Sequence, residues 1–384
     1  MVRLLSNDEI EEHFEVAEYL PIAEEMYRRM GVGEAAAAPT ETVVSQVSEP
    51  PADSSPPVFH GLRTAGGSIK GMDVSAVRLN SDLKHWPERG GTQRQERIPI
   101  TDGRYNGLVL LFSTETGELL LLFPDGVVQT FHVAGGIAVG AKHLARDDAS
   151  VLGMYGCGHQ ADAHLPALAT ACDLKEAKVY SPTRESREAF AAKMDEKLDL
   201  SVRAVDDPRD VCVGADIVNC ATNSTEPVFD PSWVEPGTHI GSIRPAEFPT
   251  DIFEREEFDQ VVITKSEQRS VDITGDTISG HREEHHNVSD AWRFFVMDSD
   301  PLSPKLQSLP AERQSVDDVT VSRLPNVVTG TDEGRTSDEE ITVLRQVGHG
   351  IAFAAIGHAL HRLAEDEDLG SEIPTSLLTQ DRVP

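Results

Sequence analysis

The chain lacks any apolar run near the roughly 20 residues that a helix needs to cross a bilayer. It has no basic excess either, because 34 Lys and Arg stand against 65 Asp and Glu, for a net charge of −31. Such a surface repels phosphate backbones and anionic headgroups, which argues against nucleic-acid or membrane-surface binding. The four cysteines form no CxxC pair and no disulfide framework. The acidic, amphipathic N-terminus has no apolar signal core, so we expect a cytoplasmic protein with reduced thiols.

The chain does contain enough material for two domains, with 384 residues of which 39% are hydrophobic. Residues 7–30 place apolar side chains mostly at helical spacing, which predicts a helix. Residues 33–57 are rich in Ala, Pro and Ser and predict a long loop with one short extended segment. Apolar runs in 58–131 are separated by Thr-Gly and Asp-Gly turns, which predicts hairpins. A small-residue helix is expected over 133–146.

From residue 149 onward, strands alternate with helices. The apolar strand SVLGMY runs into a glycine turn and a helix, and a second strand, AKVY, precedes the helix RESREAFAAKMDEKL. Further strands follow in ADIVNC, THIGSI and DQVVITK. This alternation is typical of a parallel sheet covered by helices on both faces. Residues 275–315 interrupt it with a polar stretch that we interpret as an insertion, and 342–365 predict a long helix.

The most informative motif is a GxGxxA loop that follows the first of these strands and opens the first helix, the context that a dinucleotide-binding loop requires. Gly156 allows the tight turn, Gly158 lets the backbone approach a pyrophosphate, and Ala161 allows close helix–sheet packing. The helix N-terminus adds amides and a positive dipole. The cofactor-binding residues expected here are Gly156, Cys157, Gly158, His159, Gln160 and Ala161. For Cys157 a small packing role is favoured over redox control.

The end of the second strand indicates which nicotinamide cofactor binds. An NAD site usually carries an acidic residue there to hold the ribose 2′-hydroxyl. This strand ends in Tyr-Ser-Pro-Thr-Arg with no acid before Glu185. Ser181, Thr183 and Arg184 supply two hydroxyls and a guanidinium, the groups that bind a 2′-phosphate. We therefore predict NADP(H) in preference to NAD(H), with a ribose contact from Glu185 as the alternative.

The loop is followed by VYSPT, DIVNCATNSTEPVF, the THIGS turn, GRTSDEEITV and a C-terminal helix that contains Gly348 and Gly350. In this order of segments, over most of its length, the sequence resembles the ornithine cyclodeaminase/mu-crystallin family. The resemblance implies an α/β homodimer in which a Rossmann domain is inserted into a mixed α+β domain for substrate binding and dimerisation. The implied parts are 1–146 for the substrate domain, 147–335 for the Rossmann domain with the insertion, and 336–384 for a C-terminal helix that returns to the first domain.

The same resemblance implies roles for individual residues. Lys70, in GGSIKGMDV, matches a lysine that contacts the substrate carboxylate. Ala221, Thr222 and Asn223 match a loop on the adenosine side of the cofactor. Ser242 matches a position where the chain passes near the nicotinamide.

Three departures from the family pattern concern the substrate. An arginine usually found after a proline near residue 40 is replaced in the run Pro-Thr-Glu-Thr, which contains Glu41. An Arg-Thr pair that opens the small-residue helix is replaced by His132-Val133. The aspartate that serves the cyclodeaminase as a base is replaced by Ile243. Loss of these groups weakens the case for recognition of a simple α-amino acid and for lyase chemistry.

The replacement residues suggest new roles. Arg244 is expected to restore part of the lost positive charge, and Glu41 to hold a substrate amine. For His132 we consider a proton-transfer role beside the nicotinamide, with a pKa near the working pH. The alternative is a hydrogen-bonded histidine at the start of a helix.

The stretch HREEHH places His281 and His285 four residues apart, which would put both on one face of a helix. It has arginine where the zincin motif HExxH has its glutamate, so we favour a solvated surface helix and expect no metal site.

Together these observations predict an NADP(H)-dependent oxidoreductase that transfers hydride at the α-carbon of a small amino or imino acid. Lys70 would orient the carboxylate, and His132 or a bound water would handle the proton. Two alternatives stay open: a deaminating lyase of the cyclodeaminase type, and a non-catalytic NADPH-binding protein of the mu-crystallin type. The sequence does not name the substrate, because fold does not determine function.

Overall fold

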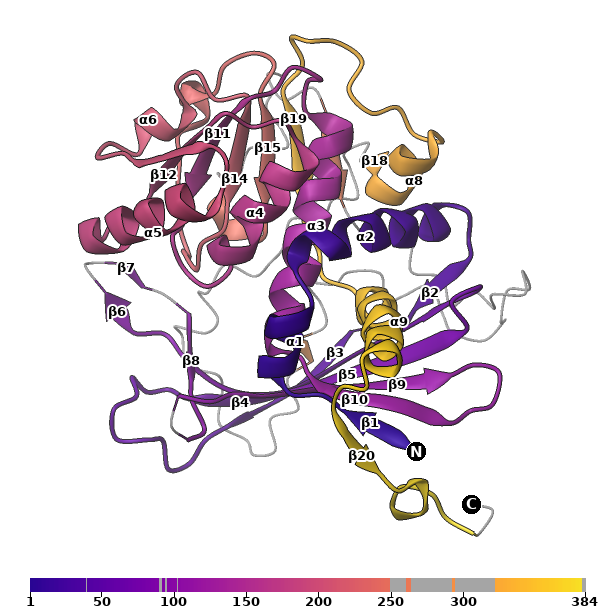
Figure 1. Cartoon of the computed structure of the whole chain (residues 1–384). Helices are drawn as coiled ribbons and strands as arrows, with labels where there is room; N and C mark the ends of the chain where they lie inside the picture. Colours follow the sequence, from indigo (N-terminus) through magenta and orange to yellow (C-terminus); the bar gives the residue numbers. More distant parts are fainter. Residues whose placement is uncertain are drawn as a thin grey trace.

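The computed structural model describes residues 1–38, 40–89, 92–93, 95–101, 103–248, 260–263, 292–293 and 322–381. In this part of the chain the strands form two large sheets, of ten and eight strands, and helix α3 (Gly126–Leu144) runs between them (Figure 1). The predicted insertion at 275–315 lies outside the described residues apart from Trp292 and Arg293, and so do His281 and His285.

The first sheet is mainly antiparallel and consists largely of hairpins. Its order is β17 (Trp292–Arg293), β3 (Glu41–Gln46), β4 (Phe59–Ile69), β5 (Val74–His85), β9 (Asn106–Ser113), β10 (Leu119–Pro124), β1 (Val2–Leu4) and β20 (Ser371–Ile373). β2 (Ala35–Ala37) pairs with β4 and β8 (Glu96–Ile98) with β5, while β6 (Glu88–Arg89) and β7 (Thr92–Gln93) form a separate ribbon. The turn between β9 and β10 needs Gly117, whose φ of +75° is rarely adopted by L side chains.

The second sheet is parallel throughout its described strands. Its order is β13 (Ser201–Ala204), β12 (Glu176–Tyr180), β11 (Val151–Tyr155), β14 (Ile217–Cys220), β15 (His239–Ser242), β19 (Thr342–Arg345), β16 (Gln260–Ile263) and β18 (Ser322–Arg323). The first five positions follow the order 3-2-1-4-5 of a doubly wound dinucleotide-binding domain, and β19 from later in the chain occupies the sixth. The predicted α/β fold with a Rossmann domain is thus confirmed.

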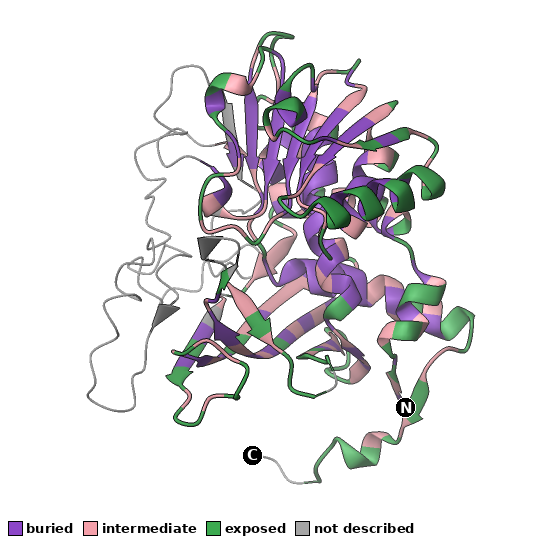
Figure 2. Ribbon diagram, turned by 90° about the vertical axis from the view of Figure 1, so that its left-hand side faces the viewer, coloured by how far each residue is buried: buried purple, intermediate pink, exposed green. Residues whose placement is uncertain are grey.

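The helices pack on both sheets. Their bounds are α1 (Asn7–His13), α2 (Val16–Gly31), α4 (Ala161–Ala171), α5 (Arg184–Lys197), α6 (Arg209–Cys212), α8 (Leu324–Thr329) and α9 (Ile351–Asp366). The single helix expected over 7–30 is two helices, because Phe14 is extended and Glu15 begins a new capping box with Glu18. Figure 2 shows the strands of the second sheet mostly buried, while the outermost helices expose one side.

Helix α9 covers the first sheet at β4 and β5, although it comes from the end of the chain (Figure 1). Glycines make this contact close. A Cβ on Gly67 would overlap the backbone of Ile351, and a Cβ on Gly350 would overlap the backbone of Gly66. The start of α9 is therefore fixed against the carboxyl-terminal part of β4.

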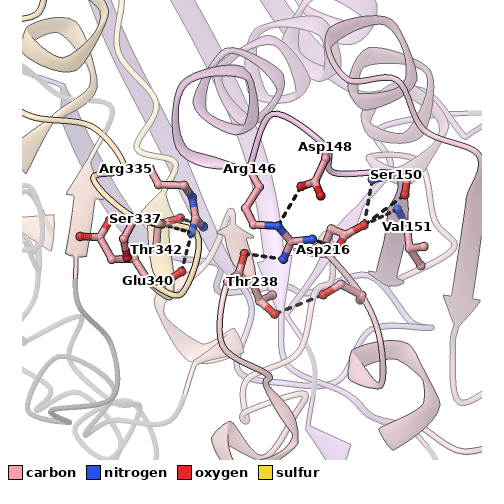
Figure 3. Close-up of polar contacts among 12 residues, drawn as sticks. Arg146, Asp148, Ser150, Val151, Asp216, Thr238, Arg335, Ser337, Glu340 and Thr342 are labelled. Atoms are coloured by element: carbon pink, nitrogen blue, oxygen red, sulfur yellow. Dashed lines mark hydrogen bonds and ion pairs between the residues drawn. The ribbon is translucent and has the colours of Figure 1, made fainter.

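A polar network anchors the carboxyl-terminal end of α3 at the amino ends of the Rossmann strands (Figure 3). Arg146 Nη2 pairs with Asp216 Oδ1 at 2.5 Å, and Asp216 accepts hydrogen bonds from the amides of Ser150 and Val151 at 2.8 and 2.9 Å. The Thr342 hydroxyl donates to the carbonyl of Leu144 at 2.9 Å. The amino-terminal end of α3 consequently lies toward the carboxyl ends of the strands of the second sheet.

No described helix is long and apolar enough to cross a membrane. Among the residues that the structure describes, no group of three or more His, Cys, Asp or Glu side chains is placed to hold a metal ion. All four cysteines are free thiols.

Candidate active site

The predicted phosphate loop lies at the carboxyl end of β11. The Gly156 amide donates to the carbonyl of Tyr180 on β12 at 2.9 Å, and φ of Gly156 is +103°. A Cβ on Gly156 would overlap the carbonyl of Ala221, whereas a Cβ on Gly158 would have no other heavy atom within 4 Å. Packing and backbone conformation thus require the first glycine, and the second borders open space of the kind into which a pyrophosphate fits.

The rest of the loop leads directly into α4. Ala161 is buried against the sheet, and the side chain of Gln160 does not cap the helix, while His159 is exposed. The first amides of α4 therefore remain available for phosphate oxygens. Cys157 packs against the hydrophobic core, and burial raises the pKa of its thiol to about 12. This agrees with a packing role, and the loop as a whole fits a dinucleotide.

Ser181 and Thr183 follow β12, and Thr183 precedes the first residue of α5. The guanidinium of Arg184 is exposed and pairs with Glu188, with 2.7 Å between Nε and Oε1. All three predicted residues of the 2′-phosphate site therefore lie together at the turn between β12 and α5.

Arg187, which the sequence reasoning missed, lies behind the same turn. Its Nη1 donates to the Ser181 carbonyl at 3.0 Å, its Nη2 pairs with Asp206 at 2.5 Å, and its guanidinium carbon lies 5.6 Å from the centre of the Tyr180 ring. Arg187 is buried, unlike Arg184. It fixes the backbone of the turn that carries Ser181 and Thr183.

The loops after β14 and β15 are joined by Glu247, a second residue that no sequence motif identified. One carboxylate oxygen accepts from the Thr222 amide at 2.6 Å and hydroxyl at 2.8 Å. The other accepts from the Ser242 hydroxyl at 2.8 Å and from the amides of Ile243 and Arg244 at 3.0 and 2.9 Å. Burial raises the pKa of Glu247, while these hydrogen bonds favour its ionised form.

Of the remaining residues predicted on these loops, Ala221 is buried and Asn223 is exposed. The Glu247 contacts show that the two predicted segments, 221–223 and Ser242, belong to one hydrogen-bonded unit at the carboxyl edge of the sheet.

Helix α3 runs antiparallel to β19 in a regular register. A Cβ on Gly136 would overlap the side-chain amide of Gln346, and a Cβ on Gly140 would overlap the side chain of Leu344. Four residues of a helix rise about 6 Å, close to the rise of two strand residues. Each step of four residues along α3 therefore matches a step of two residues along β19 and the segment after it. The pairs are His132–Gly348, Gly136–Gln346, Gly140–Leu344 and Leu144–Thr342.

His132 is 1% exposed. It belongs to the last pair of this register, at the carboxyl edge of the second sheet. Its ring centre lies 5.3 Å from that of His349 and 5.5 Å from that of Phe353, and neither ring nitrogen has a hydrogen-bond partner among the described residues. Burial, then His349 and Arg78, lower the pKa of His132 well below its usual value. The expectation of a pKa near the working pH is therefore not met, and the imidazole is neutral at pH 7.

The buried cation beside His132 is Arg78, which the sequence reasoning missed. Its Nε donates to Asp125 Oδ2 at 2.6 Å, and its guanidinium lies 5.1 Å from the centre of the Phe353 ring. Gly107 permits this pair, since a Cβ there would overlap the Asp125 carboxylate. The alternation in VSAVRL could have indicated Arg78, because it shares a strand face with the buried Val74 and Ala76.

Lys70, in contrast, is not brought to this cluster. It lies in the turn between β4 and β5 with its side chain exposed, and its carbonyl accepts a hydrogen bond from Arg29. Arg78 is four strand positions from Val74, the first residue after the turn, or about 13 Å. The structure thus separates the predicted carboxylate ligand from His132.

Arg244 and Glu41 complete the predicted set. The Arg244 side chain extends from the loop after β15 and donates to Gln95 at 2.9 Å, which connects the Rossmann domain with the segment before β8. Glu41 begins β3, and its side chain lies outside the described atoms.

The sequence profile of the ornithine cyclodeaminase/mu-crystallin family matches residues 94–364. The chain belongs to this family. It is 27% identical to a Δ1-pyrroline-2-carboxylate reductase of Bacillus cereus, over 70% of this chain and 74% of the relative. It is 29% identical to an alanine dehydrogenase of Archaeoglobus fulgidus, over 69% and 73%.

A solved structure of the Δ1-pyrroline-2-carboxylate reductase of Thermococcus litoralis, in complex with NADH and L-proline, superposes with a TM-score of 0.70. The likeness covers 97% of this chain and 100% of that one at 21% identity, which establishes a shared fold. The resemblance to the ornithine cyclodeaminase/mu-crystallin family that the ordered motifs indicated is therefore confirmed.

Proposed function

We propose that the protein is an NAD(P)-dependent oxidoreductase that reduces the C=N bond of an imino acid and, in reverse, oxidises the corresponding amino acid. The observation that supports this most is the position of a buried, neutral His132 at the same carboxyl edge as the phosphate loop and the Ser242 loop. The named relatives, reductases of a cyclic imino acid and a dehydrogenase of an amino acid, carry out this type of reaction.

When bound, NAD(P)H would supply the hydride for the imine carbon, and with one proton added to the imine nitrogen C=N and NAD(P)H would become CH–NH and NAD(P)⁺. A neutral imidazole has one N–H donor and one acceptor. His132 can therefore position the nitrogen of the substrate by one hydrogen bond and stay neutral, while a bound water supplies the proton that this nitrogen takes up. Phe353 and the start of α9 cover this side of the site and exclude water.

For the substrate carboxylate we propose Arg78 in place of Lys70. Arg78 is buried next to His132, and only part of its donor set is used by Asp125. Arg244 would contribute a second positive charge from the loop after β15, and Glu41 a negative one for a substrate amine. The deaminating alternative needs a base at position 243, where the apolar Ile243 supplies none.

For the cofactor, NADP(H) remains our preferred proposal because Ser181, Thr183 and Arg184 lie at one turn and the carboxyl end of β12 carries no acidic residue. NAD(H) is the alternative.

We also propose a homodimer. The face of the first sheet opposite α9 exposes Val43, Leu62, Leu79 and Leu108, whose paired positions on β3, β4, β5 and β9 make them neighbours. An apolar face of this kind favours association. Sedimentation equilibrium of the whole chain tests this: a monomer at micromolar concentration would contradict it.

The activity is tested by incubating the protein with NADPH or NADH and a panel of imino acids, among them Δ1-pyrroline-2-carboxylate and the imine of pyruvate with ammonia. We expect loss of reduced-nicotinamide absorbance with at least one substrate, and loss of that activity in His132→Phe. Tight nucleotide binding without turnover of any member would instead support the non-catalytic, mu-crystallin-like alternative.

A further inference from the structure

Gln346 has a buried side-chain amide that makes no hydrogen bond with the part of the chain that the structure describes. The residue is 5% exposed, and neither Oε1 nor Nε2 has a partner among the described residues. A primary amide carries two donors and an acceptor oxygen with two lone pairs. Burying such a group without hydrogen bonds costs about 1–3 kcal/mol. An unsatisfied amide at this position therefore calls for a ligand that both donates and accepts.

The position of Gln346 indicates which part of a ligand it meets. It directly follows β19, and its backbone amide donates to the carbonyl of Ser242 at the end of β15, at 2.8 Å. The strands run in the order β12, β11, β14, β15, β19. A dinucleotide whose pyrophosphate lies at Gly158 and whose adenosine ribose lies at β12 extends its other half past β14 and β15. That direction leads to Gln346.

The neighbours of Gln346 leave this amide in a fixed place. Gly136 lies directly against it, so any side chain at that position would occupy the space of the amide. His132, one helical turn away, is also buried and also has two unpartnered polar atoms. The Gln346 amide and the His132 imidazole, both uncharged and without partners among the described residues, thus lie together at the carboxyl edge of the sheet, where the nicotinamide ring and the substrate must meet.

We propose that the Gln346 side chain forms a reciprocal pair of hydrogen bonds with the carboxamide of the nicotinamide, and so sets which face of the ring is presented to the substrate. This inference rests on the proposed dependence on NAD(P). Amide-to-amide pairing satisfies one donor and one acceptor on each partner, and a buried setting strengthens both bonds. Gln346 is in this role a positioning residue, with His132 as the group that touches the substrate.

The test uses calorimetric dissociation constants, not turnover. Three ligands are compared on the whole protein: NADP⁺, its 3-acetylpyridine analogue, which replaces the amide NH₂ by a methyl group, and 2′-phospho-ADP-ribose, which has no nicotinamide. If NAD⁺ binds more tightly, the corresponding non-phosphorylated set is used. We expect wild type to bind the acetylpyridine analogue about tenfold more weakly than NADP⁺.

The matched variant is Gln346→Met, which keeps the length and volume of the side chain and removes both hydrogen-bonding atoms. We expect its dissociation constant for NADP⁺ to rise about tenfold while that for 2′-phospho-ADP-ribose changes by less than about twofold. The variant should also no longer discriminate NADP⁺ from the acetylpyridine analogue.

Wild type that binds NADP⁺ and the acetylpyridine analogue equally would overturn the inference and leave the proposed function intact. So would a Gln346→Met variant that loses affinity for 2′-phospho-ADP-ribose as strongly as for NADP⁺. Because the first comparison needs no substitution, it stands even if the variant does not fold. A wild-type protein that binds none of the ligands would overturn the proposed function together with the inference.

Discussion

Gly136 of α3 lies directly against the side-chain amide of Gln346, so closely that a Cβ on the glycine would overlap it. One turn further along the helix, Gly140 has the same relationship to Leu344. The two glycines let α3 pack closely along β19 and the segment after it. The first contact is with a polar group at the carboxyl edge, and the second is with an apolar side chain of the core.

These two contacts give a matched pair of substitutions. Gly136→Ala and Gly140→Ala should each destabilise the fold by about 1–3 kcal/mol, since each forces a neighbour to move. Only Gly136→Ala should also weaken binding of NADP⁺ relative to 2′-phospho-ADP-ribose, because it displaces the Gln346 amide. Urea denaturation and calorimetry measure the two effects. Equal loss of this ligand preference in both variants would show that the contact at Gly136 has no special role.

Glu247 allows a test of whether the loops after β14 and β15, which it joins, bind the cofactor together. Gln in its place keeps the shape but turns a hydrogen-bond donor toward the amides that Glu247 accepts from. We expect Glu247→Gln to cost about 1–3 kcal/mol of stability and to raise the dissociation constants of NADP⁺ and 2′-phospho-ADP-ribose together. Glu226→Gln is the control. Glu226 is exposed in the loop after β14, and its substitution should leave both dissociation constants unchanged. Unaltered nucleotide affinity in Glu247→Gln would mean that the carboxylate serves folding alone.

The 2′-phosphate prediction distinguishes NADPH from NADH. Arg184→Ala should raise the dissociation constant for NADPH by about tenfold, as expected for one charge-assisted contact, and leave that for NADH unchanged. The Arg184–Glu188 pair is exposed, so the substitution should not affect stability measurably. Equal affinity of wild type for the two nucleotides would contradict the NADP(H) preference without affecting the fold.

Lys70 and Arg78 are compared directly by substrate affinity. Arg78→Lys keeps the charge but shortens the reach and loses the planar fork, so KM for the imino acid should rise, whereas Lys70→Ala should leave KM unchanged. Arg78→Met is expected to cost about 3–5 kcal/mol, because it leaves the Asp125 carboxylate buried without its cation. An unchanged KM in Arg78→Lys together with a raised KM in Lys70→Ala would restore the original assignment.

His239 gives a pH prediction. Its Nδ1 lies 2.9 Å from the Thr342 hydroxyl, and burial, together with Arg335, lowers its pKa to about 3. An unfolded histidine titrates near pH 6.5, so between about pH 6.5 and 3 the unfolded chain binds the extra proton. Stability therefore falls on acidification, by up to about 1.4 kcal/mol per pH unit from this residue.

In His239→Gln the loss of unfolding free energy between about pH 7 and pH 4.5 should be correspondingly shallower than in wild type. His159→Gln, which alters an exposed residue of the phosphate loop, should keep the wild-type slope. Identical slopes in all three proteins would show that His239 is protonated in the folded state.

Local patterns predicted the Rossmann domain well. The phosphate loop needs a strand, two glycines and a helix in immediate succession, so Gly156, Gly158 and Ala161 could be identified from a few residues. The Ser181–Arg184 turn follows from the end of the next strand for the same reason. The break at Phe14 was missed because helical spacing of apolar residues continues across it.

The substrate side was predicted less well, because its residues meet only in the folded chain. Arg78 is buried because α9, which begins 273 residues later at Ile351, covers its strand face. Gln346 is significant only because Gly136 brings α3 against it. Glu247 joins loops that follow two different strands. Lys70, conversely, was selected because it resembles the lysine of a family motif. Its position in the turn follows from how β4 pairs with β5, up to Ile69 and Val74, and the motif does not contain that information.

The most direct test of the account is transfer of deuterium from nicotinamide C4-deuterated NADPH or NADH, supplied separately to the purified protein with Δ1-pyrroline-2-carboxylate and the other imino acids of the panel. We predict that mass spectrometry and NMR of at least one amino acid product will show a single deuterium at the α-carbon, and that His132→Phe will produce far less of it. Products with no deuterium at the α-carbon, or no product from any substrate while the nucleotide is bound, would contradict the proposal that this site performs hydride transfer.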